Sequence, residues 1–522
     1  MEVSKWIAEQ SSWAPQRVAL RFEGCTITYA ELEDRIAHTA AGLRARGAQR
    51  GDRIAYLGPN CPELLEVFFA CARIGGIFVP LNARMPAAEL RVFVEVAEPT
   101  LLVVEEAFQA TAMGLTSKLG GPVIAAFTIG GGDLLARGAS VAADPDADES
   151  APLLILFTSG TTGTPKGAMH TNRSVISNAE DAIAALWITS DDQVLTVLPM
   201  FHIAGLNVLT TPALSVGATV TVHRGFDAAT VLDDIERYAV TLSVAATPML
   251  AAMAASPRWQ QTDLSSIRVL SVGGTIITEE GIRSWRERGV PITQGYGMTE
   301  VGPAVMLVPL ADIPRKTLTA GKPTLHAELR IVDRDGHDLP PEDSGEVWLR
   351  SPSVTVGYWR NLEATREAIT DGWFHTGDLG YLDDEGFLHI VDRIKEIIIV
   401  GISNVYPTDL ESVLLEAPGV SEAAVVGIPD EELGEVPVAF VVRASGSTID
   451  QEQLLQLFEG RLAAYKHPRH VAFVDALPRT AIGKVQKKSL RALARSLFLE
   501  VGNSGHQRAE DTPATLRAAA SR

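Results

Sequence analysis

LLILFTSGTTGTPKG, Leu153 to Gly167, is the stretch of the 522-residue sequence that says most about the fold. Its first five residues form a continuous apolar run, which is typical of a strand buried on both faces of a parallel sheet. In the ten residues that follow, small side chains let backbone N–H groups turn toward an anion, and hydroxyl groups and Lys166 add donors and charge. The loop is not a Walker A loop, because Pro165 stands where that pattern needs Gly and Gly167 where it needs Ser or Thr. The stretch predicts a strand followed by a phosphate-binding loop.

Segments before and after this stretch alternate between helical and β patterns. Residues 30–46 and 61–74 have helical apolar spacing, and residues 53–57 and 77–81 are short β runs. From 321 to 390 the chain becomes β-rich, with turns at Asp333–Gly336 and Asp383–Gly386. The fold class predicted is α/β, with mixed α/β and β-rich subdomains. The predicted domains are a large N-terminal one over 1–393 and a small α+β C-terminal one over 394–498, followed by a disordered tail over 499–522.

Bulk properties exclude several classes of protein. A net charge of −19 argues against a nucleic-acid binder, which normally has a basic surface. Three cysteines without ligand-like spacing argue against a disulfide framework or a metal cluster. The N-terminus has no long apolar core, and the apolar stretch 64–81 is interrupted by Glu66 and Arg73, so neither a signal peptide nor a membrane span is expected. A cytoplasmic location is the expectation that follows.

Several further motifs give the sequence a family resemblance. Together with the phosphate loop, the chain resembles the acyl-adenylate-forming enzymes, which include acyl-CoA synthetases, luciferases of the firefly type and adenylation domains of peptide synthetases. The motifs follow the order of that family and span nearly the whole chain. They are PMFHIAG (199–205), QGYGMTE (294–300), GEVWLRSPSVTVGYW (345–359), GWFHTGDLGYLDDEGFLHIVDRIKE (372–396), NVYPTDLE (404–411) and PRTAIGKVQKK (478–488). The resemblance implies that the small C-terminal domain is mobile.

The resemblance implies an ATP site made from several of these motifs. Asp378 and Arg393 would hold the ribose, and Tyr296 would stack on adenine beside glycines that allow close backbone approach. The family usually has Ala where Thr275 stands. The full set of residues implied for ATP binding is Thr158, Ser159, Gly160, Thr161, Thr162, Lys166, Gly273, Gly274, Thr275, Gly295, Tyr296, Gly297, Asp378 and Arg393.

Catalytic residues are implied in the same way. Adenylation brings a carboxylate to the α-phosphate of ATP, so catalysis must neutralise charge and hold two anions in line. By resemblance Glu300 and Thr161 hold Mg²⁺, Thr299 lies at the α-phosphate, and Lys484 bridges the α-phosphate and the attacking carboxylate. Each also has an ordinary interpretation: the Thr-Glu pair is a common helix start, Asp378 fits an Asx turn, and Lys484 could be a solvated loop lysine.

The acyl and thiol sites follow from two other segments. Phe201, His202 and Gly205 would border the acyl pocket, although a lone His among apolar residues is more often a packing residue. Lys395 corresponds to the hinge about which the family rotates its small domain, and Gly401 and Ile402 to the loop that meets the pantetheine arm of coenzyme A. The family usually reads SGGENVYP here. Ile402 replaces its second glycine, which adds a β-branched side chain and makes thioester formation the less secure half-reaction.

These observations favour an ATP-dependent carboxylic acid–CoA ligase that uses Mg²⁺ and acts through an acyl-AMP, with a fatty acid as the expected substrate. The alternatives are an aromatic-acid–CoA ligase, an acyl-AMP ligase that loads an acyl-carrier protein, a luciferase-like oxygenase, and a binding protein that has lost catalysis. The segments expected around the acid, 201–209, 245–250 and 273–277, contain no Lys or Arg, so a dicarboxylate is disfavoured. The oligomeric state is left open, with a homodimer as one option.

Overall fold

The computed structural model describes residues 2–116, 127–129, 141, 148–158, 165–274, 277, 279–401, 403–430, 432–480 and 483–498. The chain divides into two compact units, which are described separately below. The first unit comprises Met1–Arg330, Trp348–Thr376 and Asp383–Leu388, and the second Ile331–Val347, Gly377–Leu382 and His389–Arg522. The expected tail, 499–522, lies outside the described residues.

A six-stranded sheet in the first unit carries the phosphate loop. Its order is β6-β5-β3-β4-β7-β8, and all neighbours are parallel except β7 and β8. Antiparallel β8 sits at the edge, where it turns back after the loop. The strands are β3 (Arg53–Leu57), β4 (Ile77–Leu81), β5 (Leu101–Glu105), β6 (Phe127–Ile129), β7 (Pro152–Thr158) and β8 (Lys166–Thr171).

A nine-stranded sheet forms the other layer of the first unit. Its order is β15-β14-β13-β12-β11-β9-β10-β1-β2, parallel from β13 to β1 and antiparallel at both edges. The strands are β1 (Val18–Phe22), β2 (Cys25–Thr28), β9 (Gln193–Thr196), β10 (Thr219–Val222), β11 (Leu242–Ala245), β12 (Val269–Gly273), β13 (Ile292–Met298), β14 (Gly302–Leu307) and β15 (Lys322–Pro323).

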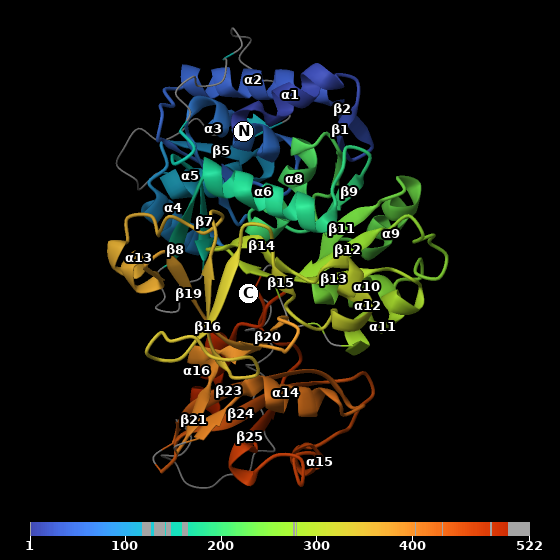
Figure 1. Cartoon of the computed structure of the whole chain (residues 1–522), viewed down its shortest axis with the longest axis vertical. Coiled ribbons are helices and arrows are strands. Elements are labelled where there is room, and N and C mark those ends of the chain that lie inside the picture. Colours follow the sequence, from blue (N-terminus) through green and yellow to red (C-terminus); the bar gives the residue numbers. More distant parts are fainter. Residues whose placement is uncertain are drawn as a thin grey trace. The chain divides into compact units, whose positions relative to one another are not determined.

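Helices cover both faces of these sheets, and α9, α10 and α11 gather beside β11, β12 and β13 (Figure 1). One core cluster joins a face of each sheet through α2, α3 and α6; it contains Tyr56 and Leu154, whereas Ala55 and Ile155 point into a different cluster with α4 and α5. Burial on both faces explains the continuous apolar runs in these strands. The helices of the first unit are α1 (Trp6–Trp13), α2 (Tyr29–Ala45), α3 (Pro62–Ile74), α4 (Ala87–Ala97), α5 (Gln109–Thr116), α6 (Asn172–Leu186), α7 (Ile203–Asn207), α8 (Thr210–Ser215), α9 (Ala228–Arg237), α10 (Thr247–Ala254), α11 (Glu279–Glu287), α12 (Ile313–Lys316) and α13 (Leu362–Ala368).

The β-rich segment predicted after residue 321 forms a third sheet, and the division into units falls within its strands β16, β17, β19 and β20. Its order is β16-β17-β19-β18, with β20 beside β19. The strands are β16 (Glu328–Val332), β17 (Gly345–Arg350), β18 (Ile369–Thr370), β19 (Trp373–Leu382) and β20 (Leu388–Arg393).

The second unit has its own sheet and core. The sheet has the order β22-β21-β24-β23 with β25 beside β24, and its longest pair, β23 and β24, is antiparallel. Its core includes Val405, Val425 and Phe458, all fully buried. The strands are β21 (Ile398–Val400), β22 (Ser403–Val405), β23 (Val420–Asp430), β24 (Gly434–Arg443) and β25 (His470–Phe473), and the helices are α14 (Pro407–Leu415), α15 (Gln451–Gln456) and α16 (Lys487–Phe498).

The predicted fold class is confirmed: the chain is a mixed α/β protein. The helices expected at 30–46 and 61–74 are α2 and α3, and the strands expected at 53–57 and 77–81 are β3 and β4, paired in parallel. The stretch 64–81 is a buried helix and strand, and within the described residues no helix is long and apolar enough to cross a membrane. The boundary at residue 393 stays a prediction about how the chain moves.

Candidate active site

Strands β7 and β8 bring the two ends of the phosphate loop together. Thr158 ends β7 and Lys166 begins β8, and the two residues face each other in the antiparallel register. Thr158 Oγ1 donates to the Lys166 carbonyl oxygen at 3.4 Å. Gly167 has no room for a side chain, because a Cβ there would lie 2.8 Å from Ile155 Cγ2. The described residues do not include the other four residues expected to bind phosphate, Ser159, Gly160, Thr161 and Thr162.

The residues expected around adenine lie on two neighbouring strands whose backbones approach closely. Gly273 of β12 pairs with Gly295 of β13, and a Cβ on Gly273 would lie 2.9 Å from the Gly295 carbonyl oxygen. A Cβ on Gly297 would lie 2.3 Å from the carbonyl oxygen of Gly302. Gly274 follows the strand with φ +80°, which favours glycine. Tyr296 is half-buried between these glycines, and Thr275 lies outside the described residues.

Glu300 lies in the turn that follows β13, and a tyrosine from a distant segment holds its side chain. The Tyr358 hydroxyl donates to Glu300 Oε1 at 3.1 Å. The backbone of Glu300 is fixed as well, since its carbonyl oxygen accepts from Thr355 N–H at 2.6 Å. The ring of Tyr358 also carries Lys166, whose Nζ lies 5.1 Å from the ring centroid. The phosphate-loop lysine and the expected metal ligand are therefore linked through one residue.

The carboxylate of Glu300 fits the Mg²⁺ that the resemblance implies. It is a hard oxygen donor, it is half-buried, and its Oε2 makes no hydrogen bond or ion pair with any residue that the structure describes. Mg²⁺ is usually bound by one or two protein carboxylates together with substrate phosphates and water, so a single carboxylate is enough. Thr161, the second residue expected at the metal, lies outside the described residues.

A buried histidine fixes the residue before Glu300. His170 of β8 has its Nε2 2.6 Å from the carbonyl oxygen of Thr299. Burial lowers the pKa of His170 to about 4, so its ring is neutral at pH 7. A carbonyl oxygen can only accept a hydrogen bond, so Nε2 must carry the ring proton and donate it. Strand β8 thus holds both Lys166 and the backbone of Thr299.

The residues expected at the acyl group lie at the start of α7. His202 is the residue before the helix, and the rings of Phe201 and His202 lie 4.8 Å apart. Phe201 lines a cavity of about 90 Å³ that also includes Arg84 and Arg224. Gly205 allows the turn before the helix to pack closely, because a Cβ there would lie 2.3 Å from the Pro199 carbonyl oxygen.

In the second unit the two residues expected at the ribose contact each other. Arg393 Nε lies 2.5 Å from Asp378 Oδ1, and the side chain of Asp378 is 4% exposed. Lys395, the expected hinge residue, follows Arg393 in a 3₁₀ turn, Ile394–Glu396. Gly401 has φ +63°, and Ile402 lies outside the described residues. The structure therefore brings Asp378 and Arg393 together, and their place at the ribose stays a prediction.

A tight turn in the second unit holds Lys484. Its backbone N–H donates to Thr480 Oγ1 at 3.1 Å, and its carbonyl oxygen accepts from Thr480 N–H at 2.7 Å. Gly483, directly before it, has φ +84°. Lys484 itself is half-buried. Its backbone is therefore fixed in the turn, and the role of its side chain in adenylation stays a prediction.

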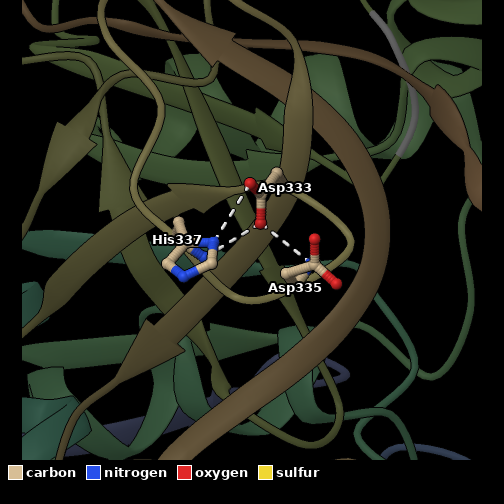
Figure 2. Close-up of side chains that lie close together, drawn as sticks. All are labelled: Asp333, Asp335 and His337. Atoms are coloured by element: carbon tan, nitrogen blue, oxygen red, sulfur yellow. Dashed lines mark hydrogen bonds and ion pairs between the residues drawn. The ribbon is translucent and has the colours of Figure 1, made fainter.

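Asp333, Asp335 and His337 form a cluster of oxygen and nitrogen donors in the second unit (Figure 2). Asp333 Oδ1 accepts from the backbone N–H groups of Asp335 and His337 at 2.8 and 2.9 Å. The turn at Asp383 has the same pattern, in which Oδ1 accepts from the N–H groups two and four residues on at 3.0 and 2.9 Å. There the fourth residue is Phe387, which cannot bind a metal. The cluster is therefore explained as a hairpin turn, as predicted at both places.

Sequence reasoning missed two residues of this site. Tyr358 stands within a quoted motif, but nothing in its neighbourhood along the chain indicates that its hydroxyl reaches Glu300, 58 residues away. His170 bonds to a backbone carbonyl 129 residues away, and a carbonyl leaves no signal in a sequence. The sequence signal near Tyr358 is the glycine directly before it. In the structure this residue, Gly357, has a φ of +137°, which favours glycine.

Comparison with known proteins gives the family and its chemistry. Residues 7–359 match the family model described as AMP-binding enzyme, and residues 409–484 match the AMP-binding enzyme C-terminal domain. The chain is 44% identical to an indoleacetate–CoA ligase of Aromatoleum aromaticum, over 96% of this chain and 100% of that one. It is 39% identical to a feruloyl-CoA synthase of Amycolatopsis, over 94% and 98%. It is 35% identical to a long-chain-fatty-acid–CoA ligase of Mycobacterium tuberculosis, over 93% and 97%.

A solved structure supports the same family assignment. The ATP-bound crystal structure of MatB from Rhodopseudomonas palustris matches with a TM-score of 0.88 and 33% identity, covering 95% of this chain and 100% of that one. The family match includes both the large domain and the smaller C-terminal one, and the three relatives named above are CoA ligases or synthases. The chain therefore belongs to the AMP-binding enzyme family and is an AMP-forming acyl-CoA synthetase, with ATP and coenzyme A as substrates.

Proposed function

We propose that the acid this ligase activates is an aromatic monocarboxylate, of the arylacetate or hydroxycinnamate class. The observation that carries the proposal is the similarity, over nearly full length, to ligases named for indoleacetate and ferulate at 44% and 39% identity. The relative named for long-chain fatty acids is 35% identical. The fatty acid expected from the sequence therefore has the weaker support, and the aromatic alternative the stronger.

The side chains of the expected acyl pocket favour a substrate that carries an uncharged ring. The segments 201–209 and 245–250 are mostly apolar and contain no Lys or Arg, so an uncharged ring can pack against them without leaving a polar group unpaired. Phe201 and His202 place two rings 4.8 Å apart at the start of α7, tilted by 43°. Aromatic side chains pack favourably against another ring in edge-to-face or offset geometry. A flat substrate can use that geometry, whereas an alkyl chain gains only burial of its surface.

Adenylation requires that two anions meet, the carboxylate and the α-phosphate. We assign Lys166 and Lys484 to neutralise phosphate charge, with Lys484 shared between the α-phosphate and the attacking carboxylate. Asp378 accepts from the ribose hydroxyls, Arg393 lies beside it, and Tyr296 stacks on adenine. Glu300 holds Mg²⁺, which when bound offsets the negative charge of phosphate oxygens. Thr299 reaches the α-phosphate while His170 holds its backbone carbonyl.

Thioester formation needs a different arrangement of the C-terminal domain, beginning at residue 394. We assign Lys395 as the hinge and the loop at Gly401 and Ile402 as the segment that meets the pantetheine arm. Ile402 adds bulk where the related enzymes usually have glycine, so transfer to coenzyme A is expected to be the slower half-reaction. Transfer to the pantetheine arm of a carrier protein is the alternative that the same loop would serve.

A panel of acids tests the proposal. The chain would be incubated with ATP, Mg²⁺ and coenzyme A and one of six acids: indole-3-acetate, phenylacetate, ferulate, hexanoate, palmitate or malonate. Pyrophosphate release and acyl-CoA formation would be followed separately. The best aromatic acid is expected to exceed the best fatty acid in kcat/KM by about tenfold or more, since one or two well-packed methylene-sized contacts contribute that much. A fatty acid with the higher kcat/KM would overturn the proposal.

A further inference from the structure

We propose that Tyr358 is a positioning residue of the adenylation site, whose hydroxyl orients the Glu300 carboxylate and whose ring holds the Lys166 ammonium group. The proposal rests on the roles given above to Glu300 and Lys166. It assigns a function to the tyrosine that neither the motif nor the family match specifies. The three side chains come from three separate parts of the first unit: β8, the turn after β13, and the segment before α13.

At Glu300 the hydrogen bond leaves one oxygen for a ligand. Tyr358 donates to Oε1 at 3.1 Å, and Oε2 makes no contact of that kind within the described part of the chain. A glutamate side chain has three rotatable bonds, and binding a cation through it costs the entropy of fixing them. A hydrogen bond that already selects one orientation lowers this cost. Partners that orient a metal-binding carboxylate raise metal affinity in this way.

The ring of Tyr358 also contacts the ammonium group of Lys166. Lys166 Nζ lies 5.1 Å from the centroid of the Tyr358 ring, within the range of a cation–π interaction. A flexible lysine next to a phosphate loop would otherwise sample many rotamers. The ring holds the ammonium group without neutralising it, because a π face carries no full charge. A carboxylate partner would hold Lys166 more strongly, but would cancel the charge that the phosphates need.

The backbone fixes Tyr358 against the strand that bears Lys166. Tyr358 forms a β-bridge with Ala168, and on either side of it Gly357 accepts from Met169 N–H at 2.9 Å and Trp359 N–H donates to Gly167 at 2.7 Å. The Tyr358 N–H donates to Thr365 Oγ1 at 2.9 Å, which ties it to α13. Gly357 makes this possible: its φ is +137°, and a Cβ would lie 2.6 Å from Thr365 Cγ2.

The simpler explanation is that Tyr358 only packs, since its side chain is 8% exposed and contacts Ala168 and Ala364. Packing by itself requires the ring but not the hydroxyl. A Tyr358→Phe variant removes the hydroxyl and keeps the ring, and Tyr358→Leu removes both electrostatic contacts while leaving an apolar side chain. Tyr56→Phe is the matched control, because it removes another buried hydroxyl, bonded to Cys61 Sγ at 2.9 Å, outside this site.

The test measures binding rather than turnover. Mn²⁺ replaces Mg²⁺ and is followed by electron paramagnetic resonance in the presence of α,β-methylene-ATP, which cannot be cleaved between its α- and β-phosphates. Nucleotide affinity is measured again without metal, and each variant's melting temperature is recorded. Tyr358→Phe is expected to weaken Mn²⁺ binding about tenfold or more, the size usual for loss of an outer partner of a metal ligand. The nucleotide affinity of Tyr358→Phe without metal should stay unchanged. Tyr358→Leu should lower both the Mn²⁺ affinity and the nucleotide affinity without metal.

The other outcomes separate this inference from the assignment of Glu300. Glu300→Gln is measured beside the tyrosine variants. If Glu300→Gln loses Mn²⁺ affinity and Tyr358→Phe does not, the inference about Tyr358 is overturned while Glu300 keeps its role. If Glu300→Gln binds Mn²⁺ as the unchanged chain does, the metal role of Glu300 itself is overturned. If Tyr358→Phe and Tyr56→Phe lower Mn²⁺ affinity and melting temperature alike, the effect is general packing, and the inference fails.

Discussion

Asp378 and Arg393 show how single residues at this site depend on neighbours that are far apart in sequence. They form an ion pair of 2.5 Å in which the side chain of Asp378 is 4% exposed and that of Arg393 is 42% exposed. The motifs predicted both residues, because each carries a charge at a recognisable position in a family pattern. The contacts of His170 and Tyr358 were not predicted. Their partners are a backbone carbonyl and a carboxylate brought close only by the fold.

The substitution Asp378→Asn is expected to weaken the binding of ATP more than the binding of the acid. The ribose hydroxyls would lose a charged acceptor, at a cost of about 1.5–3 kcal/mol per hydrogen bond. Arg393 would also lose its partner. The measurement compares the KM for ATP with the KM for the acid. Glu416→Gln serves as the control, because it breaks an exposed ion pair with Arg461 in the same unit. An unchanged KM for ATP would leave Asp378 with only a structural role, as the ion-pair partner of Arg393 in β19.

The buried ring of His170 predicts how the stability of the protein depends on pH. Burial lowers its pKa to about 4, whereas the unfolded chain has a pKa of about 6.5. Between these values the unfolded state binds a proton that the folded state does not, so stability falls as the pH falls. From pH 7 to pH 5 this amounts to about 2 kcal/mol of unfolding free energy.

A variant isolates that contribution. His170→Gln keeps a donor near the Thr299 carbonyl but has no titrating ring, so the loss of stability between pH 7 and pH 5 should shrink. Urea unfolding midpoints at the two pH values provide the measurement. His337→Gln is the control, since the side chain of His337 is 78% exposed. The same acid sensitivity in His170→Gln as in the unchanged chain would show that other groups cause it.

At the scale of elements, segments with a clear apolar pattern could be predicted, including the five-residue strands β3 and β4, whereas some of the shortest elements could not. The apolar spacing of residues 30–46 predicted α2, and Thr28 with Glu31 forms the capping box that starts it. Strand β7 was predicted from its unbroken apolar run. Helix α7 has five residues, and strand β9 has four, lengths at which a pattern of period 3.6 or 2 cannot be distinguished from chance. Their place is set by packing between the two sheets.

Leu154→Ala tests the doubly buried strand. Leu154 is 0% exposed in β7 and belongs to the core cluster between the two sheets. Removing its side chain leaves a cavity in a tightly packed interior, at a cost of about 2–5 kcal/mol. Leu362→Ala, at a site 71% exposed, should change stability little. Urea unfolding of the two variants compares them, and equal midpoints would show that β7 is not part of a rigid core.

At the scale of the whole molecule, the proposed residues fall into two compact units. Lys166, Thr299 and Glu300 belong to the first, and Asp378, Arg393, Lys395 and Lys484 to the second. The sequence predicted two domains because the β-rich segment gives way to a separate α+β pattern. It could not predict that 331–347 and 377–382 group with the second unit, since these residues belong to strands β16, β17 and β19 and to the turn between β16 and β17. Strand pairing between distant segments leaves no local signal.

Rotation of a C-terminal domain that begins at residue 394 predicts that the two half-reactions can be separated by changing one residue. Lys484 stands at a tight turn of the second unit, in a loop fixed by Thr480. If the C-terminal domain rotates between the half-reactions, Lys484 contacts the α-phosphate in the first and not in the second. Lys484→Ala should therefore lower acid-dependent pyrophosphate release by orders of magnitude, because a charge aimed at the transition state is lost. Conversion of supplied acyl-AMP and coenzyme A should fall far less.

The control must remove the same charge from the same region without touching the turn. Lys488→Ala does this, because Lys488 is exposed in α16, four residues further along the chain. Single-turnover rates for both half-reactions are measured in the three proteins. A loss confined to adenylation in Lys484→Ala, with Lys488→Ala unchanged, is the result that rotation requires. Equal losses in both half-reactions would place Lys484 in one fixed site serving both steps. The C-terminal domain from residue 394 onward would then have no reason to rotate, and the hinge at Lys395 would lose its basis.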